Sequence, residues 1–202
     1  MKPEYMNIFP TPIQMTKLDL DINKIIEFCY EMKRKDTKGA KISNIEGWQS
    51  NNILEETNDE FVKLKARIEE MANIYHDAMC FKKELIQKIY NIWININPKG
   101  SLNEWHNHPH SIFSGAFYVK VNTPVVFKHP YADINTHFWR QGALEKLHEA
   151  NSGRWAAIPK TNSLIIFPPW ISHKVDINKE DVDRISISFN TVLYKSDVKQ
   201  PF

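Results

Sequence analysis

Three of the eight histidines of this 202-residue chain lie in one short segment. His106 and His108 are two residues apart in the expected strand 104–108, where side chains at i and i+2 point to the same face. Two imidazoles can therefore act together on a metal ion. His173, at the start of another expected strand, is the best candidate for a third ligand. Such a facial set leaves part of the metal open to substrate and O₂.

His-x-His alone is a weak motif, because histidines are common in exposed loops. His110 is a further candidate ligand, but Pro109 is expected to end the strand before it. The remaining histidines have no spacing that argues for ligation: His76, His129, His137 and His148. If a metal is bound, the spacing favours His106, His108 and His173 as its ligands, and further residues must decide whether one is bound.

A polar row in the segment 184–190 adds a second chemical group. Arg184, Ser186, Ser188 and Asn190 share one face if this segment is a strand, and the residues between them are apolar. One interpretation is an amphipathic strand with its polar side in water. The other places the polar row inside a barrel, where Arg184 would bind a carboxylate through two parallel hydrogen bonds. A dicarboxylate co-substrate needs this arrangement, with one end on the metal and the other on an arginine.

The elements that must position these residues follow from hydrophobic periodicity. Apolar residues at helical spacing predict one helix that begins near Ile22 and a second over 58–79, with Thr57 or Asn58 as N-cap. From Leu85 onward, short alternating segments separated by turns predict many strands. The expected fold class is α+β, a jelly-roll core (double-stranded β-helix) with the N-terminal helices packed on one sheet. The expected strands are 90–96, 104–108, 113–121, 125–128, 163–167, 173–177 and 184–193.

Length and composition indicate a single domain over residues 1–202, with a partly helical insertion at about 131–157. The net charge of +2 is spread without a basic stripe, so nucleic-acid binding is not indicated. We find no signal peptide and no apolar run near the ~18 residues of a membrane span. A cytoplasmic location without membrane attachment is therefore the default expectation.

With these segments in view, the chain resembles the 2-oxoglutarate/Fe(II) oxygenase superfamily, and more closely a group of its members from bacteria and their phages. Five short segments in a fixed order carry the resemblance, and together they extend over most of the chain: 47–50, 106–109, 114–119, 167–173 and 184–190.

The resemblance implies a double-stranded β-helix, the cofactors Fe(II) and 2-oxoglutarate, and the release of succinate and CO₂. It implies His106 and His173 as metal ligands and Arg184 as the 2-oxoglutarate anchor. Ser186, on the face of Arg184, and Tyr118 are further candidate contacts of the co-substrate. One departure is His108, which stands where the superfamily has aspartate, so the ligand set is neutral and also suits Zn²⁺ or Ni²⁺.

The expected activity is a dioxygenase that uses O₂ to oxidise a C–H bond, usually by hydroxylation. Its substrate would be a small molecule or a peptide, and the sequence does not identify it. Two alternatives stay open. One is a cupin-type metalloenzyme that does not use 2-oxoglutarate, and the other is a jelly-roll binding module without catalysis. The oligomeric state cannot be read from the sequence.

Overall fold

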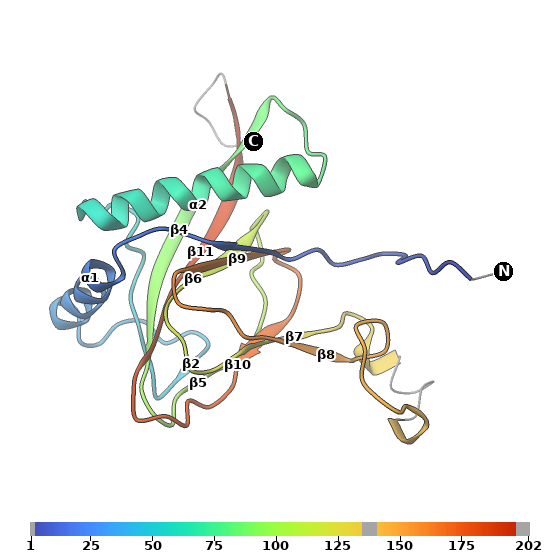
Figure 1. Ribbon diagram of the computed structural model, residues 1–202. Helices are drawn as coiled ribbons and strands as arrows, with labels where there is room; N and C mark the ends of the chain where they lie inside the picture. Colours follow the sequence, from blue (N-terminus) through green and yellow to red (C-terminus); the bar gives the residue numbers. More distant parts are fainter. Residues whose placement is uncertain (1–2, 135–140, 197–202) are drawn as a thin grey trace.

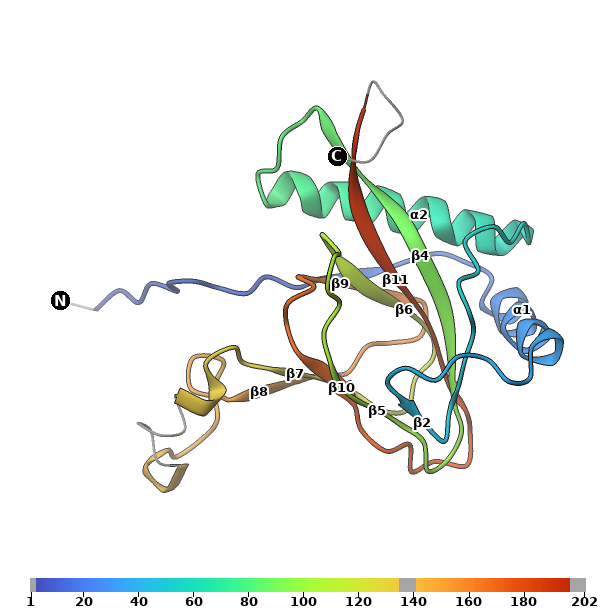
Figure 2. The ribbon, with the colours of Figure 1, turned by 180° about the vertical axis from the view of Figure 1, so that it is seen from behind.

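The structure, a computed structural model, describes residues 3–134 and 141–196. Two antiparallel sheets form its centre (Figures 1 and 2). The large sheet has the order β1-β9-β6-β11-β4-β3, and its strands are β1 (Gln14–Lys17), β9 (Ser163–Phe167), β6 (Ser114–Lys120), β11 (Arg184–Lys195), β4 (Leu85–Asn97) and β3 (Trp48–Gln49). The small sheet has the order β2-β5-β10-β7-β8, and its strands are β2 (Asn44–Ile45), β5 (Leu102–His106), β10 (His173–Val175), β7 (Val125–Lys128) and β8 (Arg154–Ala157).

Two helices cover the large sheet, as the sequence predicts. Helix α1 (Ile22–Lys35) begins after Asp21, whose side chain accepts hydrogen bonds from two backbone N–H groups of the first turn. Helix α2 (Asp59–Ala78) begins after Asn58, which caps it in the same way, so the predicted N-cap is confirmed. Figure 1 shows α2 lying across β4 and β11. The small sheet lies on the side of the large sheet away from α2.

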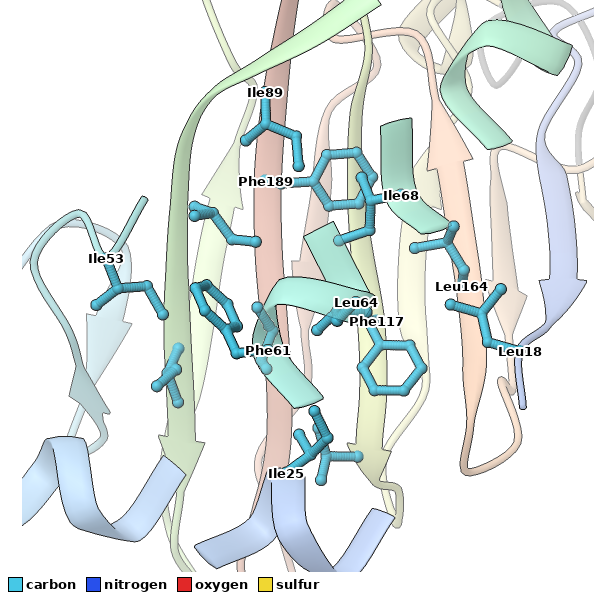
Figure 3. Close-up of a cluster of buried hydrophobic side chains, with 14 of the residues drawn as sticks. Leu18, Ile25, Ile53, Phe61, Leu64, Ile68, Ile89, Phe117, Leu164 and Phe189 are labelled. Carbon is cyan, nitrogen blue, oxygen red and sulfur yellow. The ribbon is translucent and has the colours of Figure 1, made fainter. Parts of the chain in front are cut away.

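The main hydrophobic core fills the space between the helices and the large sheet (Figure 3). Phe61, Leu64 and Ile68 of α2 are fully buried there. The apolar row of β11 also belongs to this core, with Ile185, Ile187 and Phe189 fully buried. Since side chains alternate along a strand, the polar row of β11 must face the other way, toward the small sheet. The core under the helices therefore fixes which side chains of β11 are free for a site between the sheets.

Several segments differ from the prediction. The strand expected at 104–108 ends at His106, and the one expected at 173–177 ends at Val175. The last residues of the predicted insertion, Arg154–Ala157, form β8, which pairs with β7 along four residues. The rest of the insertion includes a 3₁₀ turn at Gln141–Ala143, and residues 135–140 lie outside the described residues. That residues 1–202 form a single domain stays a prediction.

Within the described residues, no helix combines the length and the apolar character that a membrane crossing requires. The cytoplasmic location stays a prediction.

Candidate active site

Two strands of the small sheet bring His106 and His173 together. His106 is the last residue of β5 and His173 is the first residue of β10, and the two are directly paired across the sheet. Their ring centroids are 4.3 Å apart. Direct pairing holds the Cβ atoms of two such residues about 4.5–5.5 Å apart, so the strands themselves bring the two rings together.

His108 reaches the same point from outside the sheet. It lies two residues beyond the end of β5, and its backbone N–H donates to the carbonyl oxygen of Pro169. That contact ties the His108 loop to the turn that leads into His173. The sequence predicted that His106 and His108 lie close together because they point to the same face of one strand. This reason is wrong, because the strand ends before His108, but the two side chains do lie close together.

The three imidazoles form a compact cluster. One ring nitrogen from each of His106, His108 and His173 lies within 4.8 Å of those of the other two. The Nε2 atoms of His108 and His173 are 3.3 Å apart. His110 is not part of the cluster: it is exposed, with a backbone φ of 66°. The structure therefore brings together the three histidines that the sequence singled out and leaves out the fourth candidate.

Backbone carbonyls fix the tautomers of two of these rings. Nδ1 of His106 lies 2.7 Å from the carbonyl oxygen of Glu104, and Nδ1 of His173 lies 3.1 Å from that of Ile171. A carbonyl oxygen only accepts, so each Nδ1 carries the proton and each Nε2 keeps its lone pair. This is the usual preparation of a histidine for metal binding, in which the second ring nitrogen orients the ligand.

Burial keeps the cluster uncharged. Loss of solvent lowers the pKa of His106, and it lowers the pKa of His108 to about 4, with a further contribution from His106. The pKa of His173 falls to about 3, first through burial and then through its two neighbours. All three rings are therefore neutral at pH 7, which is the form that binds metals.

Arg184 lies on the same side of β11 as the cavity and is only 2% exposed. Its Nη1 donates to Ser186 Oγ at 3.2 Å, and its guanidinium carbon lies 5.3 Å from the centre of the Tyr118 ring. The Nε atom is buried without a hydrogen-bond partner. Within the described residues Arg184 forms no ion pair, and burial lowers its pKa. Burial of a cation whose N–H donor has no partner costs folding free energy, and a bound anion would offset this cost.

A cavity of about 400 Å³ between the two sheets joins these groups. It is lined by the three histidines, by Arg184 and by the rest of the polar row of β11. The prediction that this row faces a barrel interior is confirmed. Ser186 and Tyr118, the expected contacts of the co-substrate, also line the cavity, as do Trp93 and Asn95 of β4.

Asn91 is a lining residue that was not singled out from the sequence. It lies on the same face of β4 as Trp93 and Asn95, and it is paired directly with Asn190 on β11. The period-two alternation of a strand over 90–96 puts Asn91, Trp93 and Asn95 on one face, and this is the signal that could have found Asn91.

The donor set fits a metal ion and a dicarboxylate. Three neutral imidazole nitrogens within 4.8 Å suit a divalent first-row metal such as Fe(II). The buried Nε–H group of Arg184 has no hydrogen-bond acceptor within the described residues, so a ligand can supply one. A carboxylate is the acceptor that matches a guanidinium best.

Comparisons with known proteins agree with this donor set. Residues 91–190 match the sequence model of a family described as "Putative 2OG-Fe(II) oxygenase". No curated protein matches the sequence.

Solved structures with very different sequences share the fold. A Pseudomonas putida prolyl-4-hydroxylase superposes with a TM-score of 0.59 at 10% identity, over 89% of this chain and 92% of that one. A viral collagen prolyl hydroxylase from Paramecium Bursaria Chlorella virus-1 gives 0.57 at 9% identity, over 89% and 94%. HygX from Streptomyces hygroscopicus, solved with nickel, 2-oxoglutarate and hygromycin B, gives 0.59 at 9% identity, over 90% and 82%.

The fold is thus the double-stranded β-helix that the sequence predicts. The matched segment contains His106, His108, His173 and Arg184. The segment 91–190 therefore belongs to the 2OG-Fe(II) oxygenases, oxidoreductases whose cofactors are Fe(II) and 2-oxoglutarate.

Proposed function

We propose that this oxygenase hydroxylates a C–H bond of a small-molecule or peptide substrate, with His106, His108 and His173 as the ligands of Fe(II) and Arg184 as the anchor of 2-oxoglutarate. One observation carries the proposal. A buried guanidinium without a carboxylate partner shares a cavity with three neutral, convergent imidazoles. The cation matches the distal carboxylate of 2-oxoglutarate, and the imidazoles match the metal.

When bound, iron and 2-oxoglutarate would use O₂ to convert R–H to R–OH, with 2-oxoglutarate leaving as succinate and CO₂. The protein's part is positioning. The Nδ1–H groups of His106 and His173 hold their rings against backbone carbonyls. The Ser186 hydroxyl accepts a hydrogen bond from Arg184 and so orients its side chain, and the guanidinium lies over the Tyr118 ring.

Aromatic side chains keep water from the buried side of the cluster. Phe167 packs edge-on against His173 with ring centroids 4.7 Å apart, and Phe127 lies 5.9 Å from the same ring. Both phenylalanines are buried. Low water content strengthens every charge interaction inside the cavity.

His108 makes the proposed ligand set neutral, where an aspartate would add a negative charge. Three imidazoles also suit Zn(II) and Ni(II), so assays call for protein that has been stripped of metal and reloaded with Fe(II). The cupin-type alternative would keep the same metal ligands and use Arg184 for the substrate. The non-catalytic alternative would turn over nothing.

We expect the reloaded protein to convert 2-oxoglutarate to succinate slowly even without its substrate. ¹H NMR of the reaction mixture follows both compounds, and matched reactions omit Fe(II) or O₂. Succinate that forms only in the complete mixture supports the proposed function. Oxygen uptake without succinate would favour the cupin-type enzyme, and no uptake at all would favour the binding module.

A further inference from the structure

We propose that the end of the cavity formed by Asn91, Trp93 and Asn190 binds the substrate through a neutral amide group. This inference rests on the proposed function and names the substrate class of the same site. It starts from the pairing of β4 with β11, which orders the groups along the cavity.

The strand pairing separates the two ends of the cavity. Arg184 is paired with Asn97, Ser188 with Trp93, and Asn190 with Asn91. Asn190 is six residues beyond Arg184, which is about 20 Å along a strand. The ring of the proposed ligand His108 lies 5.8 Å from that of Trp93, between these two ends. The Asn91–Asn190 pair is therefore at the opposite end of this β4–β11 row from the proposed 2-oxoglutarate anchor, and a substrate would lie there.

The side chains that line the cavity favour a neutral substrate group at this end. Among the described residues the lining contains no aspartate or glutamate, so no carboxylate is present to pair with a cationic substrate. Its only arginine or lysine is Arg184, which the proposed function assigns to 2-oxoglutarate. A second anion buried at the far end would have no cation of its own, and burial of an unpaired charge is strongly unfavourable. The substrate group at this end is therefore neutral.

The two asparagines offer unused amide atoms. Asn190 is 5% exposed, and its Oδ1 accepts from Ser114 Oγ at 2.6 Å. This bond fixes the orientation of the Asn190 amide, whose Nδ2 has no hydrogen-bond partner within the described residues. Asn91, directly opposite, makes no side-chain hydrogen bond within that part of the chain, and its Oδ1 is buried without a partner.

An amide group complements this pair. Asn190 supplies a fixed donor for a carbonyl oxygen, and Asn91 supplies an acceptor for an N–H group. Two other asparagines of the lining are already engaged: Asn52 Oδ1 accepts from the backbone N–H of Ile92, and Asn103 Oδ1 accepts from Asn97. Asn95 Oδ1 is also buried without a partner, but Asn95 is paired with Ser186, nearer the Arg184 end of the cavity. Trp93, between the pair and His108, adds an aromatic surface beside a planar group.

Three probes of nearly equal shape test the charge rule. Benzamide is neutral, benzoate is an anion and benzamidine is a cation at pH 7. Binding is measured by ligand-observed NMR on the full chain loaded with diamagnetic Zn(II) and 2-oxoglutarate. We expect benzamide to bind about tenfold more tightly than either ion, since only it can satisfy Asn91 and Asn190 without burying a charge. Equal or tighter binding of benzoate or benzamidine would overturn the inference.

A fourth probe, N-methylbenzamide, distinguishes two sources of the amide. Its trans amide points the N–H and the carbonyl in opposite directions, as in a peptide bond. Benzamide presents both on one edge. A preference for benzamide assigns the amide to a carboxamide, and a preference for N-methylbenzamide assigns it to a peptide backbone.

Asn91→Leu removes the acceptor and should reduce the preference for benzamide over benzoate to about twofold or less. The matched control is Asn23→Leu, which removes an exposed amide from α1 and should keep the parent preference. The affinity for 2-oxoglutarate is measured in both variants, and parent values show that the folded site is intact. A full benzamide preference in Asn91→Leu would contradict the assignment.

Different experimental results would contradict the substrate inference and the proposed function. If the metal-loaded protein does not bind 2-oxoglutarate, the proposed function is wrong and the substrate inference falls with it. If 2-oxoglutarate binds and the ionic probes bind as well as benzamide, only the substrate inference is wrong.

Discussion

Replacing His173 with alanine is expected to lower the affinity for Fe(II) by about 100-fold or more and to abolish 2-oxoglutarate turnover. Loss of a hydrogen bond behind a metal ligand alone costs about 10- to 100-fold, and loss of the ligand itself costs more. His173 is buried and central to the cluster, close to both His106 and His108. Anaerobic calorimetry with Fe(II) measures the effect.

His110→Ala is the matched control for this change, because His110 is a nearby histidine that lies outside the cluster. It should bind Fe(II) as the parent does. His108→Asp, which replaces one imidazole with a carboxylate, should keep iron binding, whereas His108→Ala should lose most of it. If His173→Ala and His108→Ala both bound Fe(II) like the parent, the ligand set would be wrong.

Arg184→Leu is expected to weaken 2-oxoglutarate binding by about 2–5 kcal/mol, or roughly 30- to several thousand-fold, with little effect on the metal. Arg184 is buried, so water does not screen its interaction with a carboxylate. The variant should fold, because within the described residues no carboxylate loses an ion-pair partner and leucine suits a buried position.

Calorimetry of 2-oxoglutarate with Zn(II)-loaded protein measures this affinity. Arg154→Leu is the control, since it removes an exposed arginine outside the cavity. Parent-like affinity in Arg184→Leu would show that another group holds the co-substrate. In that case the cupin-type assignment of Arg184 to the substrate would gain support.

The sequence predicted those parts of the fold in which local pattern and tertiary structure agree. The β11 residues alternate between apolar and polar from Arg184 to Asn190, and each set faces the predicted side. The α2 stripe and its cap at Asn58 are equally local signals. Such segments are readable because a single period decides which residues are buried.

Other features depend on contacts far apart in the chain. The short strands β1, β2 and β3 have four residues or fewer and were not predicted, because so few residues show no period. His108 reaches the cluster through a hydrogen bond from its N–H to Pro169, 61 residues later, which no local pattern encodes. The pairing of Asn91 with Asn190 likewise follows from strand register, which is known only once β4 and β11 are aligned.

The most direct test of the central claim is an anaerobic titration of the metal-free protein with Fe(II) and 2-oxoglutarate, followed by visible absorption. Three imidazoles that hold iron beside an anchored 2-oxoglutarate predict a metal-to-ligand charge-transfer band that appears only when both are present. The same titration with His173→Ala should give no band. A parent protein that binds Fe(II) but shows no new band at saturating 2-oxoglutarate would contradict the account.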